Sequence, residues 1–239
     1  MSAHPLDRPI WTALTTRQEP LAEIGGPARR YPVDIAPFAD IADMSAGSWS
    51  ALLQLMRTGE QAVLFTPDPI IPSRDFDVVM AATGEQMIGT PADFLGPAPA
   101  IVKLGTEDAP AMRDIVELTK PGPFGPRTHE LGNFFGIKID GRLVALTGER
   151  MKPANYTEMT AVCVHPDFRG KGYAQAMLAH VSRQILARGE IPFLHVYSQN
   201  ASAISLYKRQ GMTIRRRLHV TMLARAGEKA PESIPHLHT

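Results

Sequence analysis

A short glycine-rich segment between a predicted strand and a predicted helix constrains this fold more than any other feature. Residues 165–174 read HPDFRGKGYA and follow the β-branched run TEMTAVCV at 157–164. Apolar residues then recur at helical spacing over 172–188, and PFLHVYS at 192–198 is typical of a buried strand. The order strand, helix, strand predicts a right-handed βαβ crossover with two parallel strands.

The same crossover sits inside a longer alternating pattern. Prolines in TPADFLGPAPA (90–100) oppose regular structure, so we place a domain boundary there. From residue 99 the order is β-α-β-β-β-α-β-α-β, with a hairpin at Asp140-Gly141 and a closing strand or hairpin pair at 212–223. We expect an α/β domain over residues 99–226 and a C-terminal tail over 227–239.

The N-terminal part, residues 1–98, has a weaker pattern. Residues 30–38 and 61–66 are predicted strands around a helix at 48–59, and residues 76–89 read as strand, turn and strand. This resembles half of the C-terminal pattern without its glycine-rich turn. Our hypothesis is a smaller, degenerate half-copy with a structural or substrate-lining role.

Composition excludes several classes of protein. The net charge of +1 gives no bulk attraction to nucleic acid or to an anionic membrane, and no apolar run approaches the ~20 residues that span a bilayer. A single cysteine excludes an internal disulfide framework, and the N-terminus has no signal-peptide pattern. We therefore expect a cytoplasmic protein without nucleic-acid or membrane partners. The histidines show no metal-ligand spacing, so no metal is expected.

The glycine-rich turn has a chemical interpretation. A helix N-terminus presents unpaired N–H groups and partial positive charge, and glycines let a bulky anion approach them. The alternative to anion binding is a structural role, as a tight β-to-α turn whose charged side chains contact only water. The segment is neither a P-loop nor the glycine pattern of a dinucleotide site. It predicts a phosphate site of another kind.

The flanking residues carry a family resemblance. VCVHPDFRGKGYA (162–174) resembles the acyl-CoA motif of the GNAT superfamily of N-acyltransferases, and LHVYSQNASAISLYKRQGM (194–212) resembles its next motif. PGPFGPRT (121–128) and LGNFFGI (131–137), with HPDFRGKGYA, resemble the glycine N-acyltransferase-like branch. The resemblance covers about residues 99–224. It implies an α/β, or α+β, fold with a GNAT-like mixed central sheet, in which the βαβ crossover forms the acyl-CoA site.

The resemblance also implies a set of coenzyme-binding residues. The amides of the turn would hold the CoA diphosphate, while the preceding strand would pair with the pantetheine arm. An amide near Val164 would polarise the thioester carbonyl. The two parallel strands are expected to splay apart and leave a slot for the arm. Asn200, which could equally be an N-cap, would contact the pantetheine. The full set is Val162, Cys163, Val164, Arg169, Gly170, Lys171, Gly172, Tyr173, Ala174, Asn200 and Ala203.

Two residues are candidate catalysts. Strand alternation would place Glu158 on the same face as Val164, where it matches a frequent general base of the superfamily; the alternative is a surface carboxylate. Tyr207 lies two helical turns after Asn200 and matches the general acid; the alternative is a core aromatic. The same alternation turns the Cys163 side chain away from the Glu158 face, so we expect a buried side chain and not a nucleophile.

The loop KPGPFGPRTHELGNF (120–134) is the candidate acceptor side of the site. Phe124 and Arg127 could contact the apolar part and the carboxylate of the acceptor. The alternative is a rigid proline- and glycine-rich loop in which the arginine only caps other groups.

Together these features predict transfer of an acyl group, acetyl being favoured, from acyl-CoA to a primary amine by direct attack in a ternary complex. An amino acid or small amine is the favoured acceptor, and a protein N-terminus or lysine is second. The alternatives are a non-catalytic acyl-CoA sensor or scaffold and a plain structural domain. A homodimer is compatible with the sequence.

Overall fold

The computed structural model describes residues 4–93, 95–96 and 99–228. The N-terminal part contains two helices, two 3₁₀ turns and five strands, which are η1 (Pro5–Asp7), α1 (Pro9–Leu14), η2 (Glu19–Leu21), β1 (Glu23–Gly25), β2 (Ala28–Arg30), β3 (Ala39–Ile41), α2 (Ala46–Leu55), β4 (Gln61–Thr66) and β5 (Phe76–Ile88). Beyond residue 99 the elements follow the predicted order, namely β6 (Ile101–Leu104), η3 (Thr106–Asp108), α3 (Ala109–Thr119), η4 (Thr128–Leu131), β7 (Phe134–Ile139), β8 (Arg142–Glu149), β9 (Tyr156–Val164), η5 (Pro166–Phe168), α4 (Tyr173–Leu186), β10 (Ile191–Tyr197), α5 (Ala201–Arg209) and β11 (Thr213–Arg225).

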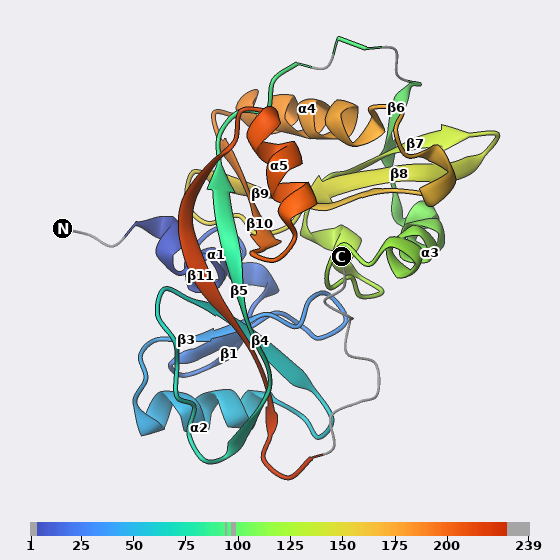
Figure 1. The fold of residues 1–239 in the computed structure, drawn as a ribbon. Helices are drawn as coiled ribbons and strands as arrows, with labels where there is room; N and C mark the ends of the chain where they lie inside the picture. Colours follow the sequence, from blue (N-terminus) through green and yellow to red (C-terminus); the bar gives the residue numbers. More distant parts are fainter. Residues whose placement is uncertain (1–3, 94, 97–98, 229–239) are drawn as a thin grey trace.

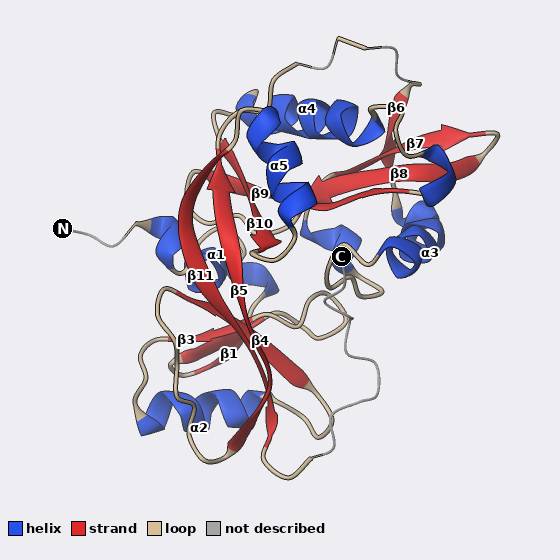
Figure 2. Cartoon of the chain, viewed as in Figure 1, coloured by secondary structure: helices blue, strands red, loops and turns tan. Residues whose placement is uncertain are grey.

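One eight-stranded mixed sheet joins the two parts of the chain (Figures 1 and 2). Its order is β4-β11-β5-β10-β9-β8-β7-β6, in which only β9 and β10 run parallel. Strands β4 and β5 come from the N-terminal part, and β5 lies between β11 and β10. The predicted boundary near residue 98 therefore divides the sequence but does not divide the sheet. The C-terminal tail lies outside the described residues beyond residue 228.

Strands β5 and β11 differ from their predicted forms. Residues 76–89 were expected to turn, and residues 212–223 allowed a hairpin pair, yet each forms one continuous 13-residue strand. Strand β5 pairs with β11 from Phe76 to Ile88 and with β10 from Gly84 to Ile88. Backbone hydrogen bonds on both edges favour the extended form over the turn that Thr83-Gly84 suggests locally.

Two helices cover opposite faces of the C-terminal part of the sheet. Helix α4 packs Met177 and Val181 on Phe135 and Val144, while α3 packs Met112 on Phe134 and Leu146. Phe134 and Phe135 are neighbours on β7 and point to opposite faces, so these two clusters lie on either side of the sheet.

A β-bulge in β9 changes which side chains face which helix. Leu146 of β8 pairs with Cys163, but Gly148 pairs with Thr160, so β9 carries one extra residue between these pairs. Ala161 at the bulge has a left-handed φ of 51°. Bulges bend a strand and shift its side-chain alternation. Cys163 consequently shares a face with Thr160 and Glu158, and the expectation that Val164 shares the Glu158 face is wrong.

The N-terminal part contains its own small βαβ arrangement. Phe38, just before β3, makes an isolated parallel bridge to Val63 of β4, and α2 connects the two segments. A three-stranded antiparallel sheet, β1-β2-β3, packs beneath α2. The degenerate half-copy stays a hypothesis that this arrangement supports. The expectation of a mixed α/β segment agrees with the elements that form.

Candidate active site

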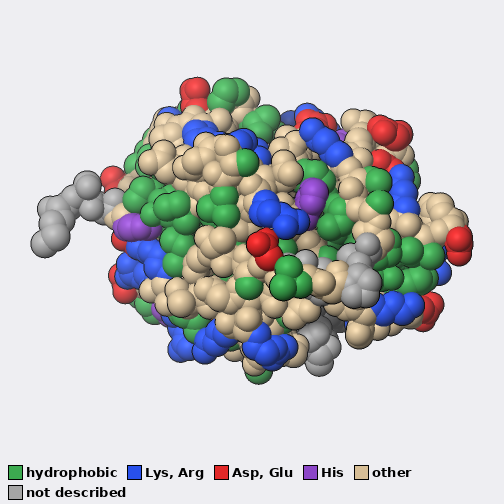
Figure 3. All heavy atoms as spheres, turned by 90° about the horizontal axis from the view of Figure 1, so that it is seen from above, with side chains coloured by type: hydrophobic (Ala, Val, Ile, Leu, Met, Phe, Trp, Pro, Cys, Tyr) green, Lys and Arg blue, Asp and Glu red, His purple; other side chains and the backbone are tan. Residues whose placement is uncertain are grey.

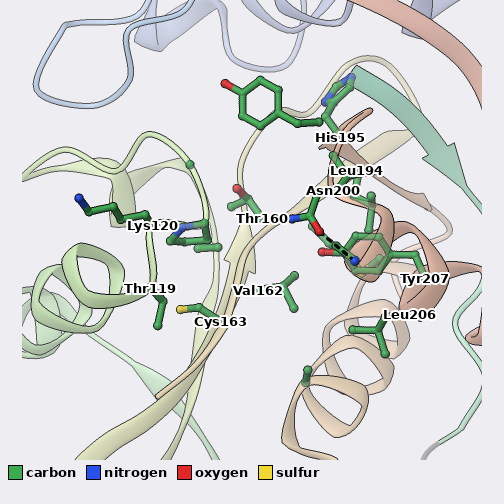
Figure 4. A pocket seen from close by; sticks show the side chains of 18 of the residues that line it. Thr119, Lys120, Thr160, Val162, Cys163, Leu194, His195, Asn200, Leu206 and Tyr207 are labelled. Atoms are coloured by element: carbon green, nitrogen blue, oxygen red, sulfur yellow. Dashed lines mark hydrogen bonds between the residues drawn. The ribbon is translucent and has the colours of Figure 1, made fainter. Parts of the chain in front are cut away.

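A cavity of about 770 Å³ opens where β9 and β10 separate (Figure 4). The two strands pair only from Tyr156–Ile191 to Glu158–Phe193. Beyond these residues β10 continues to pair with β5. The edge of β9 that is turned toward β10 pairs with no strand from residue 159 to 164 among the described residues, while the opposite edge pairs with β8. The separation that the sequence resemblance implied is therefore present. An open strand edge can accept an extended ligand as an additional strand.

The glycine-rich turn forms one end of this cavity. Gly170 and Gly172 have φ values of 77° and 76°, a region that side chains with a Cβ rarely adopt. Gly172 is the N-cap of α4 and provides no side-chain cap. Among the described residues, the amides from Gly170 to Gly172 donate no backbone hydrogen bond. The turn thus presents free N–H groups at a helix N-terminus, which suits a diphosphate.

Most of the predicted coenzyme-binding residues line the cavity. From β9 these are Val162, Cys163 and Val164; from the turn and α4, Arg169, Gly170, Gly172, Tyr173 and Ala174; and from α5, Asn200 and Ala203. Lys171 does not line it; its Nζ lies 4.9 Å from the centre of the Phe168 ring. The exposed ammonium therefore stands beside the turn on the outside.

Helix α5 places Asn200 and Tyr207 on one side of the cavity, opposite Thr119 and Cys163 (Figure 4). The Asn200 Oδ1 accepts a hydrogen bond from the Ala203 amide at 3.0 Å, so Asn200 is the N-cap of this helix. Burial raises the pKa of Tyr207 to about 12. The phenol consequently stays protonated near neutral pH and can donate a hydrogen bond.

Cys163 is buried on the α3 side of the sheet, where it packs with Leu146 and Ala161. Burial raises the pKa of its thiol to about 12, which disfavours the nucleophilic thiolate. The side chain points toward the Glu158 face and not away from it as alternation predicted, because the bulge intervenes. The inference that Cys163 is not a nucleophile agrees with this environment, although the predicted direction was wrong.

Glu158 is fully buried and does not line the cavity. Its Oε2 accepts from Arg150 Nε at 2.8 Å and from the Met151 amide at 3.3 Å, and its Oε1 accepts from Arg150 Nη2 at 2.7 Å. His195 Nδ1 lies 2.7 Å from the same Oε1. Burial opposes the charged form, but the charge and hydrogen bonds of Arg150 lower the pKa of Glu158 to about 2. This geometry does not support Glu158 as a direct base.

His195 was not recognised from the sequence, because its partners are distant in the chain. It lies on β10 and lines the cavity. Its Nε2 is 3.0 Å from Gln86 Nε2, and the Gln86 amide is oriented by donation to the Leu6 carbonyl and acceptance from Arg215. Gln86 therefore donates to Nε2, which leaves the His195 Nδ1–H to donate to Glu158.

The loop after α3 reaches the cavity through residues other than those predicted. Lys120 and Pro121–Pro123 line it, whereas Phe124 and Arg127 do not. Phe124 stacks edge-to-face on Phe134 with ring centres 5.6 Å apart. Arg127 is bound to Asp34 at 3.1 Å and to Glu130 at 2.7 Å. The structure thus places both residues in loop-stabilising contacts and not in the acceptor side of the cavity.

The N-terminal part supplies a wall of the cavity. The side chains come from the segment before β3 and from β4 and β5, and β11 completes the wall; they are Phe38, Val63, Phe65, Met80, Val220 and Met222. This apolar set, with Arg150 and His195, lies on the face of the sheet opposite the α4 cluster. No sequence motif marked these residues.

The surface and the described side chains give three further findings. Figure 3 shows lysines and arginines distributed among acidic side chains over the face seen from above. Within residues 4–93, 95–96 and 99–228, no three His, Cys, Asp or Glu side chains gather closely enough to hold a metal ion, and no helix is both long and apolar enough to cross a membrane.

An open strand edge that ends at a turn of free amides is an arrangement that suits a long, phosphate-bearing ligand beside a sheet. Comparison with known proteins identifies the class of protein to which this chain belongs. The FR47-like protein family model matches residues 135–220. The ribosomal protein bS18-alanine N-acetyltransferase of Salmonella typhimurium is 30% identical over an alignment of 128 residues that covers 49% of this chain and 85% of that protein. The chain belongs to the GNAT superfamily of acetyltransferases.

Solved structures agree with this assignment. A protein from Novosphingobium aromaticivorans described as a GNAT-family acetyltransferase superposes with a TM-score of 0.86 at 38% identity, covering 94% of this chain and all of the other. A GCN5-related N-acetyltransferase from Kribbella flavida shares the fold with a TM-score of 0.57 at 17% identity, over 86% of this chain and 89% of the other. The first match extends through the N-terminal part, so that part belongs to the shared fold. GNAT acetyltransferases use acetyl-CoA as co-substrate.

Proposed function

We propose that this protein is an N-acetyltransferase that moves the acetyl group of acetyl-CoA, or a related acyl group, to the primary amine of an amino acid or small amine. We place it in the glycine N-acyltransferase-like branch of the superfamily on the residues of its proline- and glycine-rich loop. The main support is one arrangement: the unpaired edge of β9 leads to the free amides at Gly170–Gly172, and Tyr207 lines the same cavity.

The residues of the cavity divide the binding task. The Arg169 amide donates to the Pro166 carbonyl, so the amides from Gly170 to Ala174 hold the diphosphate at the N-terminus of α4, with the Arg169 side chain beside them. The open edge of β9 from Val162 to Val164 pairs with the pantetheine arm, and an amide near Val164 donates to the thioester carbonyl oxygen. Asn200 borders the arm while its Oδ1 caps α5.

The chemistry is direct attack in a ternary complex. The neutral amine attacks the carbonyl carbon of the thioester, a C–N bond forms and the C–S bond breaks. The amine proton leaves to water in the cavity, Tyr207 donates a proton to the departing sulfur, and the resulting phenolate recovers a proton from that water. The phenol is protonated near neutral pH, and burial, which raises its pKa to about 12, extends that form to higher pH.

Glu158 acts in this proposal as a positioning residue. Its carboxylate already accepts from Arg150, Met151 and His195, so it has no contact with the cavity through which to take a proton. It fixes the orientation of Arg150 and His195, which do line the cavity. The direct-base role expected from alternation is replaced by this indirect one.

A sensor without turnover is less consistent with the chain. A sensor needs only the turn and the open strand edge, yet the described structure also places a protonated phenol in the cavity. The family comparison likewise does not favour a sensor.

The decisive experiment incubates the full-length protein with acetyl-CoA and a panel of amino acids, small amines and peptides, and follows free thiol. Release that depends on the added amine, with an equal amount of N-acetyl product, supports the proposal. Thermal stabilisation by acetyl-CoA without thiol release from any amine would favour the sensor. Peptides as the only productive acceptors would exclude the small-molecule assignment.

A further inference from the structure

Arg150 presents one free edge of its guanidinium to the active-site cavity. The residue is only 7% exposed and lines the cavity. Its Nε and Nη2 are both bound to Glu158, and its Cζ lies 4.6 Å from the centre of the Phe38 ring. Nη1 has no hydrogen-bond partner among the described residues and is not one of the fully buried unpaired atoms. A buried arginine is thus held rigid on one side while its other side stays open.

The open edge suits a carboxylate. Besides the Nε/Nη2 edge bound to Glu158, the guanidinium has a second parallel pair of N–H groups, from Nη1 and the other hydrogen of Nη2, and a carboxylate can accept both together. Glu158 already fixes the plane of the group, so little side-chain entropy is lost when a ligand binds. Lys120 lines the same cavity, is exposed and has no ion-pair partner among the described residues.

An apolar wall borders this edge directly. The Phe38 ring that lies against Arg150 is 5.4 Å from the Phe65 ring, which is 4.8 Å from the ring of His195. His195 in turn contacts Glu158, the partner of Arg150. These side chains therefore surround one region of the cavity.

The wall continues across three neighbouring strands. Met222 of β11 pairs with Val63 of β4 on one side and with Met80 of β5 on the other, and Val220 pairs with Phe65. All five line the cavity. An apolar side chain entering here would remove this surface from water, which favours binding.

We propose that the acceptor is an α-amino acid with an apolar side chain, whose carboxylate binds the free edge of Arg150 and whose side chain packs on the wall formed by Phe38, Val63, Phe65, Met80, Val220 and Met222. This inference rests on the proposed function and specifies its acceptor. The N-terminal part, which supplies four of these wall residues, then determines which amino acid is used.

The first test compares three acceptors that differ only at the carboxylate: L-phenylalanine, L-phenylalaninamide and phenethylamine. Each is assayed with acetyl-CoA at equal concentrations of unprotonated amine, because their amine pKa values differ. We expect kcat/KM for the acid to exceed both others by about 10- to 100-fold, the usual range for a charge-assisted bidentate contact. Equal or better turnover of the amide or the amine would overturn the proposal.

The second test changes the arginine and keeps its charge. Arg150→Lys should bring the ratio of kcat/KM for the acid to kcat/KM for the amine close to one. A lysine ammonium cannot bind Glu158 and also present a second pair of parallel N–H groups. Arg17→Lys is the matched control, since Arg17 lies outside the cavity and pairs with Glu190. A preference that survives Arg150→Lys in a folded protein would contradict the assignment.

A binding measurement on the wild-type protein tests the carboxylate site even if the variant does not fold or no turnover is observed. Wild-type protein with CoA is titrated with N-acetyl-L-phenylalanine and with N-acetylphenethylamine by calorimetry. Tighter binding of the acid supports the carboxylate site even if catalysis is not observed, in which case only the proposed function fails. Equal binding of the two overturns the carboxylate site itself.

The wall is tested separately by filling it. Met80→Trp should lower kcat/KM for phenylalanine at least about tenfold relative to that for glycine. Val78→Trp is the control, because Val78 lies on the same strand but is exposed and outside the cavity. An unchanged phenylalanine-to-glycine ratio in Met80→Trp would show that the side chain binds elsewhere.

Discussion

Arg150 and Glu158 form a two-point ion pair inside the sheet, with Nε–Oε2 and Nη2–Oε1 distances of 2.8 and 2.7 Å. Glu158 is fully buried, and Arg150 keeps contact with the cavity. The pair therefore connects the core to the site: the carboxylate is the fixed part, and the guanidinium is the part that a ligand can reach.

Removing the charge of Glu158 should destabilise the protein. Glu158→Gln leaves a buried guanidinium without its counter-charge, and breaking a buried pair in this way costs about 3–5 kcal/mol. Chemical denaturation should show this loss, while Glu117→Gln, an exposed change on α3, should stay within about 0.5 kcal/mol of wild type. A loss below about 1 kcal/mol for Glu158→Gln would mean that the pair contributes little.

The same pair predicts a pH dependence of stability. Glu158 has an ordinary pKa of 4.5 that falls to about 2 in the folded protein, since the charge and hydrogen bonds of Arg150 outweigh burial. A folded pKa below the unfolded one stabilises the protein above the unfolded value, and this stability is lost as pH falls from about 5 toward 2. Over that range the free energy of unfolding should fall more steeply with falling pH in wild type than in Glu158→Gln. Parallel curves would contradict a lowered pKa.

The order of elements beyond residue 99 could be predicted because its signals are local. The turn at Gly170–Gly172, the Asp140-Gly141 hairpin and the apolar spacing of the helices each lie within a few residues. The bulge at Ala161 has no such signal, since neither glycine nor proline marks it and a left-handed alanine is uncommon. One inserted residue reversed the alternation, and with it the predicted directions of Glu158 and Cys163.

The polar network of the site could not be predicted for a different reason. Gln86, Arg150, Glu158 and His195 are separated by up to 109 residues and meet only because β5 lies beside β10. No sequence pattern within the C-terminal part indicates that an N-terminal strand takes this place. The substrate-lining role suggested for the N-terminal part stays a prediction, supported by its residues in the cavity wall.

Deleting residues 1–98 should prevent independent folding of the remainder. The deletion removes β5, which pairs with both β10 and β11, and so exposes two strand edges and the wall of the cavity. We expect fragment 99–239 to aggregate or to melt without cooperativity, and co-expression with 1–98 to restore soluble complex. A cooperative melt of the fragment alone would support a separate C-terminal domain.

The glycine turn can be tested with two substitutions that carry the same backbone strain. Gly172 and Gly189 have φ values of 76° and 74° at opposite ends of α4, and valine at either position is strained. Only Gly172→Val should weaken CoA binding, by at least about tenfold, because its side chain obstructs the amides that face the cavity. Calorimetry with CoA measures this. Equal affinity in the two variants would exclude the turn as the diphosphate site.

Tyr207→Phe tests the proton donor without changing the shape of the cavity. The phenol is 8% exposed, and burial raises its pKa to about 12, so it is protonated across the usual assay range. Its loss should lower kcat about 100-fold or more with little change in the affinity for acetyl-CoA, since general acids contribute roughly 10²–10⁴ in rate. Tyr156→Phe is the control, because Tyr156 contacts His4 outside the cavity.

The pH profile provides an independent check on the same residue. A donor with a pKa near 12 produces no fall in kcat between pH 7 and about 10, so the wild-type rate should rise to a plateau as the amine loses its proton. The residual rate of Tyr207→Phe should follow the same rising limb, because the limb belongs to the amine. A kcat within twofold of wild type in Tyr207→Phe would show that water, and not the phenol, protonates the departing sulfur.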